Sequence, residues 1–173
     1  MDNLNNLFDE YVEDEDTQYS QYLTFVVDEQ LYGISISDVE QISGMMEITY
    51  VPEFPEYAKG VVNLRGNIIP IIDIRLRLKK EEIVGNGRKC IIITKINDSQ
   101  LSFVVDSVSD VININNDDIS NPKIGSDYVN TYITGMAKLN DKIILLMDLN
   151  KIINLEELIV DHAVNKDVKE GKI

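Results

Sequence analysis

Histidine and cysteine, two residue types that often perform catalysis, each occur once in this chain of 173 residues. The one histidine, His162, follows the last apolar run in a polar tail, where we expect a solvated side chain with no catalytic role. The one cysteine, Cys90, opens the apolar run CIIIT, which indicates a buried small hydrophobe more than a nucleophile. A single His and a single Cys make neither a zinc site nor a nucleophile–base pair, so the sequence predicts no catalytic residue and no metal site.

Two aspartates, Asp73 and Asp148, occupy related places, each directly after an apolar run. They could be imagined as a catalytic carboxylate pair, but the position after a strand favours another role. An Asp side chain there accepts hydrogen bonds from the first N–H groups of a following helix, so we predict that both are helix N-caps. The glycine motifs that hold phosphate, GxxxxGK[ST] and GxGxxG, are missing, and no cofactor is expected.

Arg65 is the charged residue with the most specific setting. It precedes Gly66 in a tight turn between the apolar runs 61–64 and 68–72, where glycine supplies the positive φ of a hairpin. The pattern alone favours a turn residue in solvent. The functional interpretation is a guanidinium fork that positions a partner or locks a neighbouring helix.

Short β-type runs separated by turn residues dominate the chain between residues 21 and 155. A capping-box pattern, S-x-x-E, predicts one short helix that starts at Ser37 and carries Val39 and Ile42. Pro70, inside its run, predicts an edge strand or a bulge. Many short strands and few helical stretches predict an all-β fold of barrels or sandwiches. The strand-like runs are 22–27, 31–34, 61–64, 68–72, 89–96, 101–105, 133–139 and 143–147.

An internal repeat is the strongest signal of how the chain is organised. The segment GVVNLRGNIIPIIDI from Gly60 resembles GMAKLNDKIILLMDL from Gly135 at a constant offset. At a slightly different offset, DEQL from Asp28 resembles DSQL from Asp98. Two blocks in the same order indicate a duplication. Because each half is small for a stable core, we expect the halves to share apolar surface at a seam, with a binding groove there.

The charge and composition exclude several classes of partner. The formal net charge is −14, and residues 1–20 hold seven Asp and Glu with no Lys or Arg, as is typical of a solvated arm. Nucleic acids and anionic membranes attract clustered Lys and Arg, so neither is an expected partner. The chain has no membrane-length apolar run, no secretory-signal pattern and no cysteine pair, which together indicate the cytosol.

Four blocks of sequence stand in a recognisable order. They are YLTFVVDEQLYGISISDVEQI, ITYVPEFPEYAKGVVNLRGNIIPIIDIRLRL, LSFVVDSVSDVI and YITGMAKLNDKIILLMDLNKII. Together they resemble the CheW family of bacterial chemotaxis coupling proteins over about residues 20–155. NLRG followed by IIPIID, with VVDSVSDV further on, is specific as a set.

The resemblance implies two SH3-like five-stranded β-barrel subdomains with short helices and a hydrophobic groove between them. It implies a non-enzymatic adaptor that couples the cytoplasmic tips of methyl-accepting chemoreceptors to the regulatory domain of the histidine kinase CheA. Such a protein is cytoplasmic, is recruited to membrane-bound receptor arrays without inserting into the membrane, and contributes no phosphotransfer. The expected division is a flexible acidic arm (1–19), a CheW-like domain of two interleaved halves (20–155) and a polar tail (156–173).

The resemblance also implies partner-binding positions. Val39, on the predicted helix, and Val108, in VVDSVSDV, are expected to be apolar groove walls for a helical receptor tip. Gly60 and Arg65 are the matching positions around the NLRG hairpin. Gly60 fits because the entry to a hairpin tolerates little bulk.

One position departs from the family pattern. Where the family has a Glu that pairs with the NLRG arginine, this chain has Gln41, and the Glu stands one position earlier at Glu40. On the predicted helix, neighbouring side chains point about 100° apart, so Glu40 is no simple substitute. Gln41 can still accept one neutral hydrogen bond from Arg65, weaker than a charge-assisted one.

Two other classes stay open on sequence alone. An SH3- or OB-like module that binds general proteins or nucleic acids fits the barrels, but not the charge or the lack of interleaved basic and aromatic residues. The other is a CheW-like domain fused to a receiver, as in CheV, or to a kinase, as in CheA. Neither a phospho-accepting aspartate context nor an ATP site fits the tail, so we expect the stand-alone form.

Overall fold

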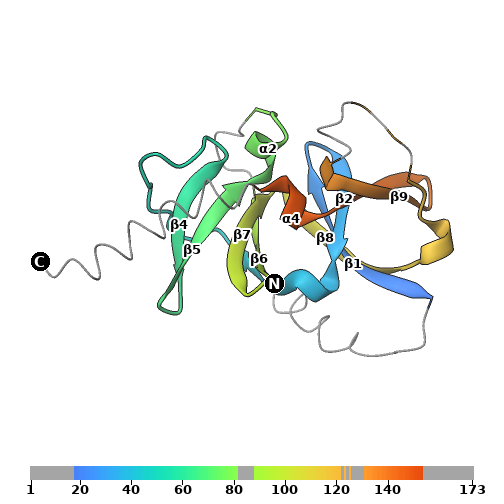
Figure 1. The fold of residues 1–173 in the computed structure, drawn as a ribbon, viewed down its shortest axis with the longest axis horizontal. Helices are drawn as coiled ribbons and strands as arrows, with labels where there is room; N and C mark the ends of the chain where they lie inside the picture. Colours follow the sequence, from blue (N-terminus) through green and yellow to red (C-terminus); the bar gives the residue numbers. More distant parts are fainter. Residues whose placement is uncertain (1–17, 82–87, 122, 124, 126–130, 154–173) are drawn as a thin grey trace, which may run out of the picture.

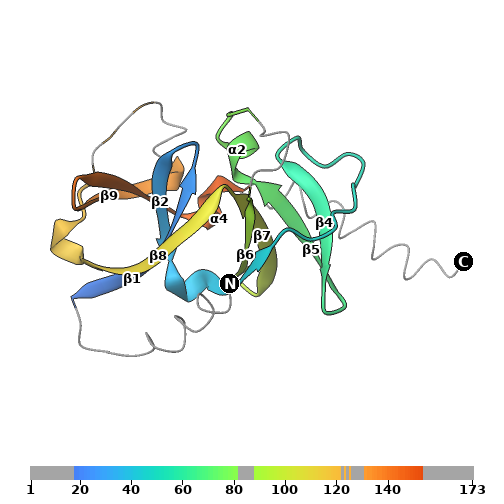
Figure 2. The same cartoon turned by 180° about the vertical axis from the view of Figure 1, so that it is seen from behind.

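Two five-stranded sheets, each curled into a barrel, lie side by side (Figure 1; Figure 2). The computed structural model describes residues 18–81, 88–121, 123, 125 and 131–153, so nearly all of the predicted arm and the whole predicted tail lie outside the described residues. The strands are β1 (Tyr19–Val27), β2 (Gln30–Ser35), β3 (Val39–Gly44), β4 (Ala58–Leu64), β5 (Asn67–Asp73), β6 (Cys90–Ile96), β7 (Ser99–Val105), β8 (Ser107–Asn115), β9 (Ile133–Leu139) and β10 (Lys142–Met147). The short helices are η1 (Ile36–Asp38), α2 (Ile74–Arg77), η2 (Asn116–Asp118) and α4 (Leu149–Ile152). The predicted all-β fold with SH3-like subdomains is confirmed.

The two sequence repeats interleave to build these barrels. Barrel 1 has the strand order β8-β1-β2-β10-β9, and barrel 2 has the corresponding order β3-β6-β7-β5-β4. Each barrel therefore takes a hairpin from one repeat and three strands from the other. Strands of different repeats meet at two parallel pairs, β2 with β10 and β5 with β7, and at two antiparallel pairs, β1 with β8 and β3 with β6. One backbone hydrogen bond recurs at equivalent positions of the two repeats. The N–H of Asp73 donates to Tyr57 O, and the N–H of Asp148 donates to Tyr132 O, each at 2.8 Å.

Two-residue turns join β1 to β2, β4 to β5, β6 to β7 and β9 to β10, and so confirm the predicted hairpins. In the β4–β5 turn, Arg65 and Gly66 have φ values of 51° and 88°. Left-handed values at both turn residues match the right-handed twist of the flanking strands. The Asn63 side chain braces this turn by accepting a 2.9 Å hydrogen bond from the N–H of Gly66.

The two predicted N-caps are confirmed. The Asp73 carboxylate accepts hydrogen bonds from the N–H groups of Arg75 and Leu76 at the start of α2, at 2.9 and 3.4 Å. The Asp148 carboxylate accepts one from the N–H of Asn150 at the start of α4, at 2.9 Å. Both helices end a barrel and lie near the junction of the two barrels (Figure 1).

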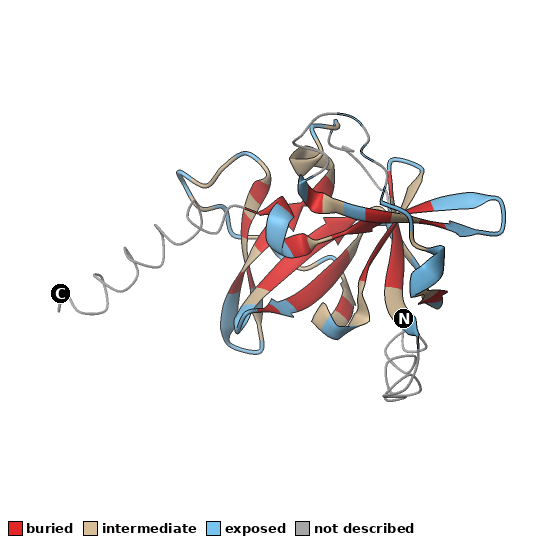
Figure 3. Cartoon of the chain, turned by 45° about the vertical axis from the view of Figure 1, so that its right-hand side comes forward, coloured by how far each residue is buried: buried red, intermediate tan, exposed pale blue. Residues whose placement is uncertain are grey.

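Buried residues occur along the strands of both barrels (Figure 3), and hydrophobic side chains from both barrels form one cluster. The largest buried cluster draws on both barrels and includes Phe25 of barrel 1 and Phe103 of barrel 2. Two smaller clusters, around Ile144 in barrel 1 and Ile71 in barrel 2, occupy single barrels. The expected shared seam is therefore a core common to both barrels.

The predicted helix at Ser37 was wrong. The only helical residues at this point are those of η1, and Val39 and Ile42 belong to strand β3. The Ser35 side chain, at the N-cap position, makes no capping hydrogen bond, and Ser37 Oγ lies 2.8 Å from Ser35 Oγ. Pairing of β3 with β6 satisfies the backbone instead, since tertiary pairing overrides a weak local cap.

The placement of Pro70 was also wrong. Its strand, β5, lies between β7 and β4 and is not an edge, and the bulge falls in β4 between Ala58 and Gly60. Proline is tolerated here because the parallel ladder to β7 begins only at the next residue, Ile71. The carbonyl of Pro70 accepts a 2.8 Å hydrogen bond from Ser102 Oγ instead.

Candidate partner-binding site

Two of the predicted contact residues sit on different barrels at the rim of the same core. Val39 belongs to β3 of barrel 2, where it pairs with Thr94, and Val108 belongs to β8 of barrel 1, where it pairs with Phe25. Both side chains are half-buried and pack against the shared cluster at the seam. The structure thus places one apolar side chain from each barrel beside the seam, and the groove itself stays a prediction.

Gly60 is a structural position. It is buried, has a φ of +143°, and a Cβ built there would lie 2.0 Å from the carbonyl oxygen of Thr49. Thr49 and Val61 exchange two 2.9 Å backbone hydrogen bonds at this point, which link the segment after β3 to β4. A side chain at Gly60 therefore collides with the backbone bridge that closes barrel 2, which agrees with the expected intolerance of bulk.

Arg65 is exposed at the tip of the β4–β5 hairpin. With the residues that the structure describes, its guanidinium makes no hydrogen bond or ion pair, and the turn is held by Asn63 instead. The five donors of the fork are therefore available to a partner.

Gln41 and Glu40 lie on a strand, which changes their geometry. The register between β3 and β6 shifts between Val39 and Gln41, so Glu40 lies at a bulge and the angle expected on a helix does not apply. Glu40 is exposed and accepts a 2.7 Å hydrogen bond from Gln100, while Gln41 is half-buried. The expected hydrogen bond between Gln41 and Arg65 is not formed among the described contacts.

The strongest charged contact was missed by sequence reasoning. Arg75, on α2, grips Asp106, in the connection from β7 to β8, with two hydrogen bonds of 2.7 Å from Nε and Nη2. This bidentate geometry is the strongest form of an Arg–carboxylate pair. Asp28 and Lys80 extend it, through a 3.7 Å contact between Arg75 and Asp28 and a 3.0 Å contact between Lys80 and Asp28. We call these four residues the Arg75 cluster.

Within the Arg75 cluster, Arg75 and Asp106 shift each other's pKa. Burial raises the pKa of Asp106, but hydrogen bonds from Arg75 and from the N–H of Asp28, with the charges of Arg75 and Lys89, outweigh it and leave that pKa below its usual value. The hydrogen bond to Asp106 raises the pKa of Arg75 in turn. No local pattern signals this pair, because its members stand 31 residues apart.

Two further contacts join the barrels on the side of α4. The Arg77 guanidinium lies over the ring of Tyr57, 4.7 Å from its centre, and its Nε donates a hydrogen bond to Ile152 O. The Asn97 side chain donates to Asn150 Oδ1 at 3.5 Å. The arginine contact ties α2 to α4, whereas the Asn97 contact is long and neutral.

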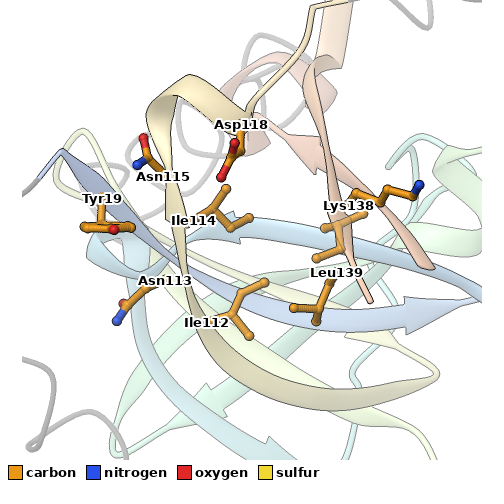
Figure 4. Close-up of a pocket in the computed structure, with 9 residues that line it drawn as sticks. Tyr19, Ile112, Asn113, Ile114, Asn115, Asp118, Lys138 and Leu139 are labelled. Atoms are coloured by element: carbon orange, nitrogen blue, oxygen red, sulfur yellow. The ribbon is translucent and has the colours of Figure 1, made fainter. Parts of the chain in front are cut away.

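One pocket of the structure lies away from the seam (Figure 4). It opens towards the interior of barrel 1, since Ile114 and Ile144 belong to the inner cluster of that barrel. Tyr19 stands at the edge of this pocket. In the described part of the chain, no group of three or more His, Cys, Asp and Glu can hold a metal ion. The residues around the pocket are Tyr19, Ile112, Asn113, Ile114, Asn115, Asp118, Lys138, Leu139 and Ile144.

Together these features define a class: a duplicated, strand-exchanged all-β module that offers apolar and charged contacts at the junction of two barrels. A CheW-like domain matches residues 21–157 of this sequence, and the chain belongs to the CheW family. The chemotaxis protein CheW of Klebsiella aerogenes is 31% identical over 150 residues, which cover 86% of this chain and 90% of that protein. CheW of Thermotoga maritima is 30% identical over 146 residues, which cover 83% and 93%.

The structural comparison agrees with the sequence comparison. The crystal structure of the scaffolding protein TtCheW from Thermoanaerobacter tengcongensis superimposes with a TM-score of 0.70 at 34% identity, and covers 75% of this chain and 89% of that one. The chemotaxis protein CheV3 of Helicobacter pylori is 31% identical over 152 residues, which are 46% of its length. In the part of the chain that the structure describes, no helix is long and apolar enough to cross a membrane.

Proposed function

We propose that this protein is a non-enzymatic chemotaxis adaptor that couples the cytoplasmic tips of methyl-accepting chemoreceptors to the regulatory domain of the histidine kinase CheA. The observation that carries the proposal is the match to the CheW-like domain across residues 21–157, together with relatives that are chemotaxis and scaffolding proteins. The surface at the seam, with contact side chains from both barrels, suits protein binding more than small-molecule chemistry.

The receptor contact is proposed at the seam. Val39 and Val108 flank the shared core from the two barrels and supply apolar surface for a receptor helix. Arg65, free of partners among the described residues, adds a charged contact at the hairpin tip. Gln41, half-buried on β3, is proposed as a further contact position, where the family resemblance implies a Glu.

The site of action is proposed to be cytoplasmic, at membrane-bound receptor arrays. Nucleic acid is not a partner in this proposal, because a net charge of −14 opposes phosphate binding. No cofactor is needed, since an adaptor acts by contact alone. The alternative of a general SH3- or OB-like binding module has no observation that favours it over the family match.

A pull-down with a chemoreceptor cytoplasmic fragment and with CheA tests this proposal. Val108→Met places a longer side chain at the seam and is expected to weaken receptor capture roughly tenfold. Arg65→Asn, which keeps a residue suited to positive φ, is expected to weaken it less. Both variants should retain CheA binding and the wild-type circular dichroism spectrum.

The matched control is Ile112→Met, four residues along β8, at the pocket and away from the seam. It should leave receptor capture unchanged. Wild-type capture by Val108→Met, or equal loss in Ile112→Met, would contradict the site. Failure of the unaltered protein to bind either partner, or retention of single-stranded nucleic acid on a filter at low salt, would contradict the function.

A further inference from the structure

The spacing of the two apolar walls depends on how the barrels are held together. Val39 lies on a strand of barrel 2 and Val108 on a strand of barrel 1. Hydrogen-bonded ladders fix each wall within its own barrel, but the seam between the barrels is mainly apolar core. Apolar contact is non-directional and leaves relative orientation weakly specified. Directional contacts across the seam must therefore set the spacing.

Among the contacts of the described residues, the Arg75 cluster holds the only bidentate charged pair at the seam. Arg75 follows β5 of barrel 2, whereas Asp28 lies in the β1–β2 turn of barrel 1. Asp106 stands between them, where the chain passes from β7 of barrel 2 to β8 of barrel 1. The side chains of Arg75 and Asp106 are only 13% and 19% exposed, so solvent screens this pair weakly.

Asp106 connects the Arg75 hydrogen bonds to the strand that carries Val108. Its N–H donates to Val26 O at 3.0 Å, and its Oδ2 accepts from the N–H of Asp28 at 2.8 Å. Both its backbone and its side chain are thus fixed, two residues before Val108 in the sequence. A movement of Arg75 relative to Asp106 consequently moves the start of β8 relative to barrel 2.

The repeat supplies a natural comparison on the other side of the seam. At the offset that relates Asp73 to Asp148, Arg75 corresponds to Asn150. There the contact is the single 3.5 Å hydrogen bond with Asn97, between exposed neutral side chains. The repeat-related positions are therefore unequal: Arg75 makes a bidentate charged pair, whereas Asn150 makes only a weak amide pair, on the edge where Arg77 also donates to Ile152 O.

We propose that Arg75 is a positioning residue for receptor binding: through its fork on Asp106 it sets the separation of the Val39 and Val108 walls without touching the partner. The inference rests on the proposed function for its consequence, because the walls are those of the proposed receptor site. Its mechanical part, the fixed angle between the barrels, is independent of any partner.

A pair of spin labels, one on each barrel, measures the distance between the barrels and so reports a change in their relative orientation. Ile68 and Ile143, in repeat-related hairpins of barrels 2 and 1, are 70% and 50% exposed and suit labelling as Ile68→Cys and Ile143→Cys in a full-length Cys90→Ser background. Arg75→Gln is expected to broaden or shift the distance distribution. Asn150→Ala, the repeat-related control, is expected to leave it as it was.

Binding is measured on unlabelled full-length proteins with the same receptor fragment. Arg75→Gln should weaken receptor binding roughly tenfold while CheA is still captured, and Arg75→Lys should restore part of the loss, because it keeps the charge but not the fork. Asp106→Asn should reproduce both effects, and it serves as the test if Arg75→Gln does not fold.

Each outcome either supports or overturns the positioning role of Arg75. An unchanged distance distribution in Arg75→Gln and Asp106→Asn overturns the proposal, and so does an equal response in Asn150→Ala. Weakened binding with an unchanged distribution would make Arg75 a direct contact and would also overturn it. If the unaltered protein binds no receptor while the distances shift as expected, the proposed function fails and the mechanical role of Arg75 stands.

Discussion

Arg65 and Arg75 show how differently two arginines in one chain can be used. Arg65 projects from a hairpin tip and makes no polar contact with the described residues, whereas Arg75 is mostly sheltered and grips a carboxylate with two hydrogen bonds. The sequence singled out the first, because NLRG is a local pattern. The second depends on Asp106, which only the tertiary fold brings near, so no local reading identifies it.

Asp106 makes the stability of the protein sensitive to acid. Because its pKa is lower in the folded state than in the unfolded chain, its contribution is present at neutral pH and is lost as the pH falls through the folded value. Urea unfolding at a series of pH values from 7 to 2 should show a steeper fall for the wild type than for Asp106→Asn. Asp38, whose pKa is raised by burial and by Asp148, is present in both proteins and cancels in the comparison. Parallel curves would contradict this role of Asp106.

Turns, strands and helix caps could be predicted from the sequence where the residue types of a short segment determine them. The hairpin turns, eight strand-like runs and both aspartate caps follow from turn residues and β-branched runs. The strands β3 and β8 were missed, because β3 overlaps a capping-box pattern and β8 reads SVSDVININ, in which polar residues interrupt the apolar ones. Of the candidate site, the positions of Val39 and Val108 came from the family resemblance. Their placement on separate barrels requires the strand order, which no local pattern contains.

The aspartate caps and the unused capping box should differ in their effect on stability. Asp73→Ala is expected to lower the free energy of unfolding by about 1–2 kcal/mol, because a buried carboxylate that accepts two N–H groups is lost. Asp148→Ala removes one such hydrogen bond and should lower it by about 1 kcal/mol. Ser37→Ala should change it by less than about 0.5 kcal/mol, since no helix is capped there. Urea titration measures all three, and a large loss in Ser37→Ala would restore the helix interpretation.

At the scale of the whole molecule, the shared core and the exchanged strands make the two barrels one cooperative unit. The largest cluster contains side chains from both barrels, and each barrel contains strands from both repeats. Unfolding one barrel exposes the core face of the other. We therefore expect a single unfolding transition, the same by fluorescence and by circular dichroism.

Cutting the chain between the repeats tests this unity. A fragment of residues 1–84 holds β1 to β5, and a fragment of residues 85–173 holds β6 to β10, so neither contains a complete barrel. Each fragment alone should be unfolded, and the two mixed together should regain the amide NMR spectrum of the intact chain. A well-dispersed spectrum from either fragment alone would contradict the interleaved architecture.

The strand exchange also bears on how genes can carry this module. Each barrel contains strands from both repeats, so a gene that acquires the coding sequence of only one repeat encodes no complete barrel. Transfer of this domain to another gene therefore requires the coding sequence of both repeats. The match within CheV3, where a segment of similar length accounts for under half of a longer polypeptide, is consistent with transfer of the module as a whole.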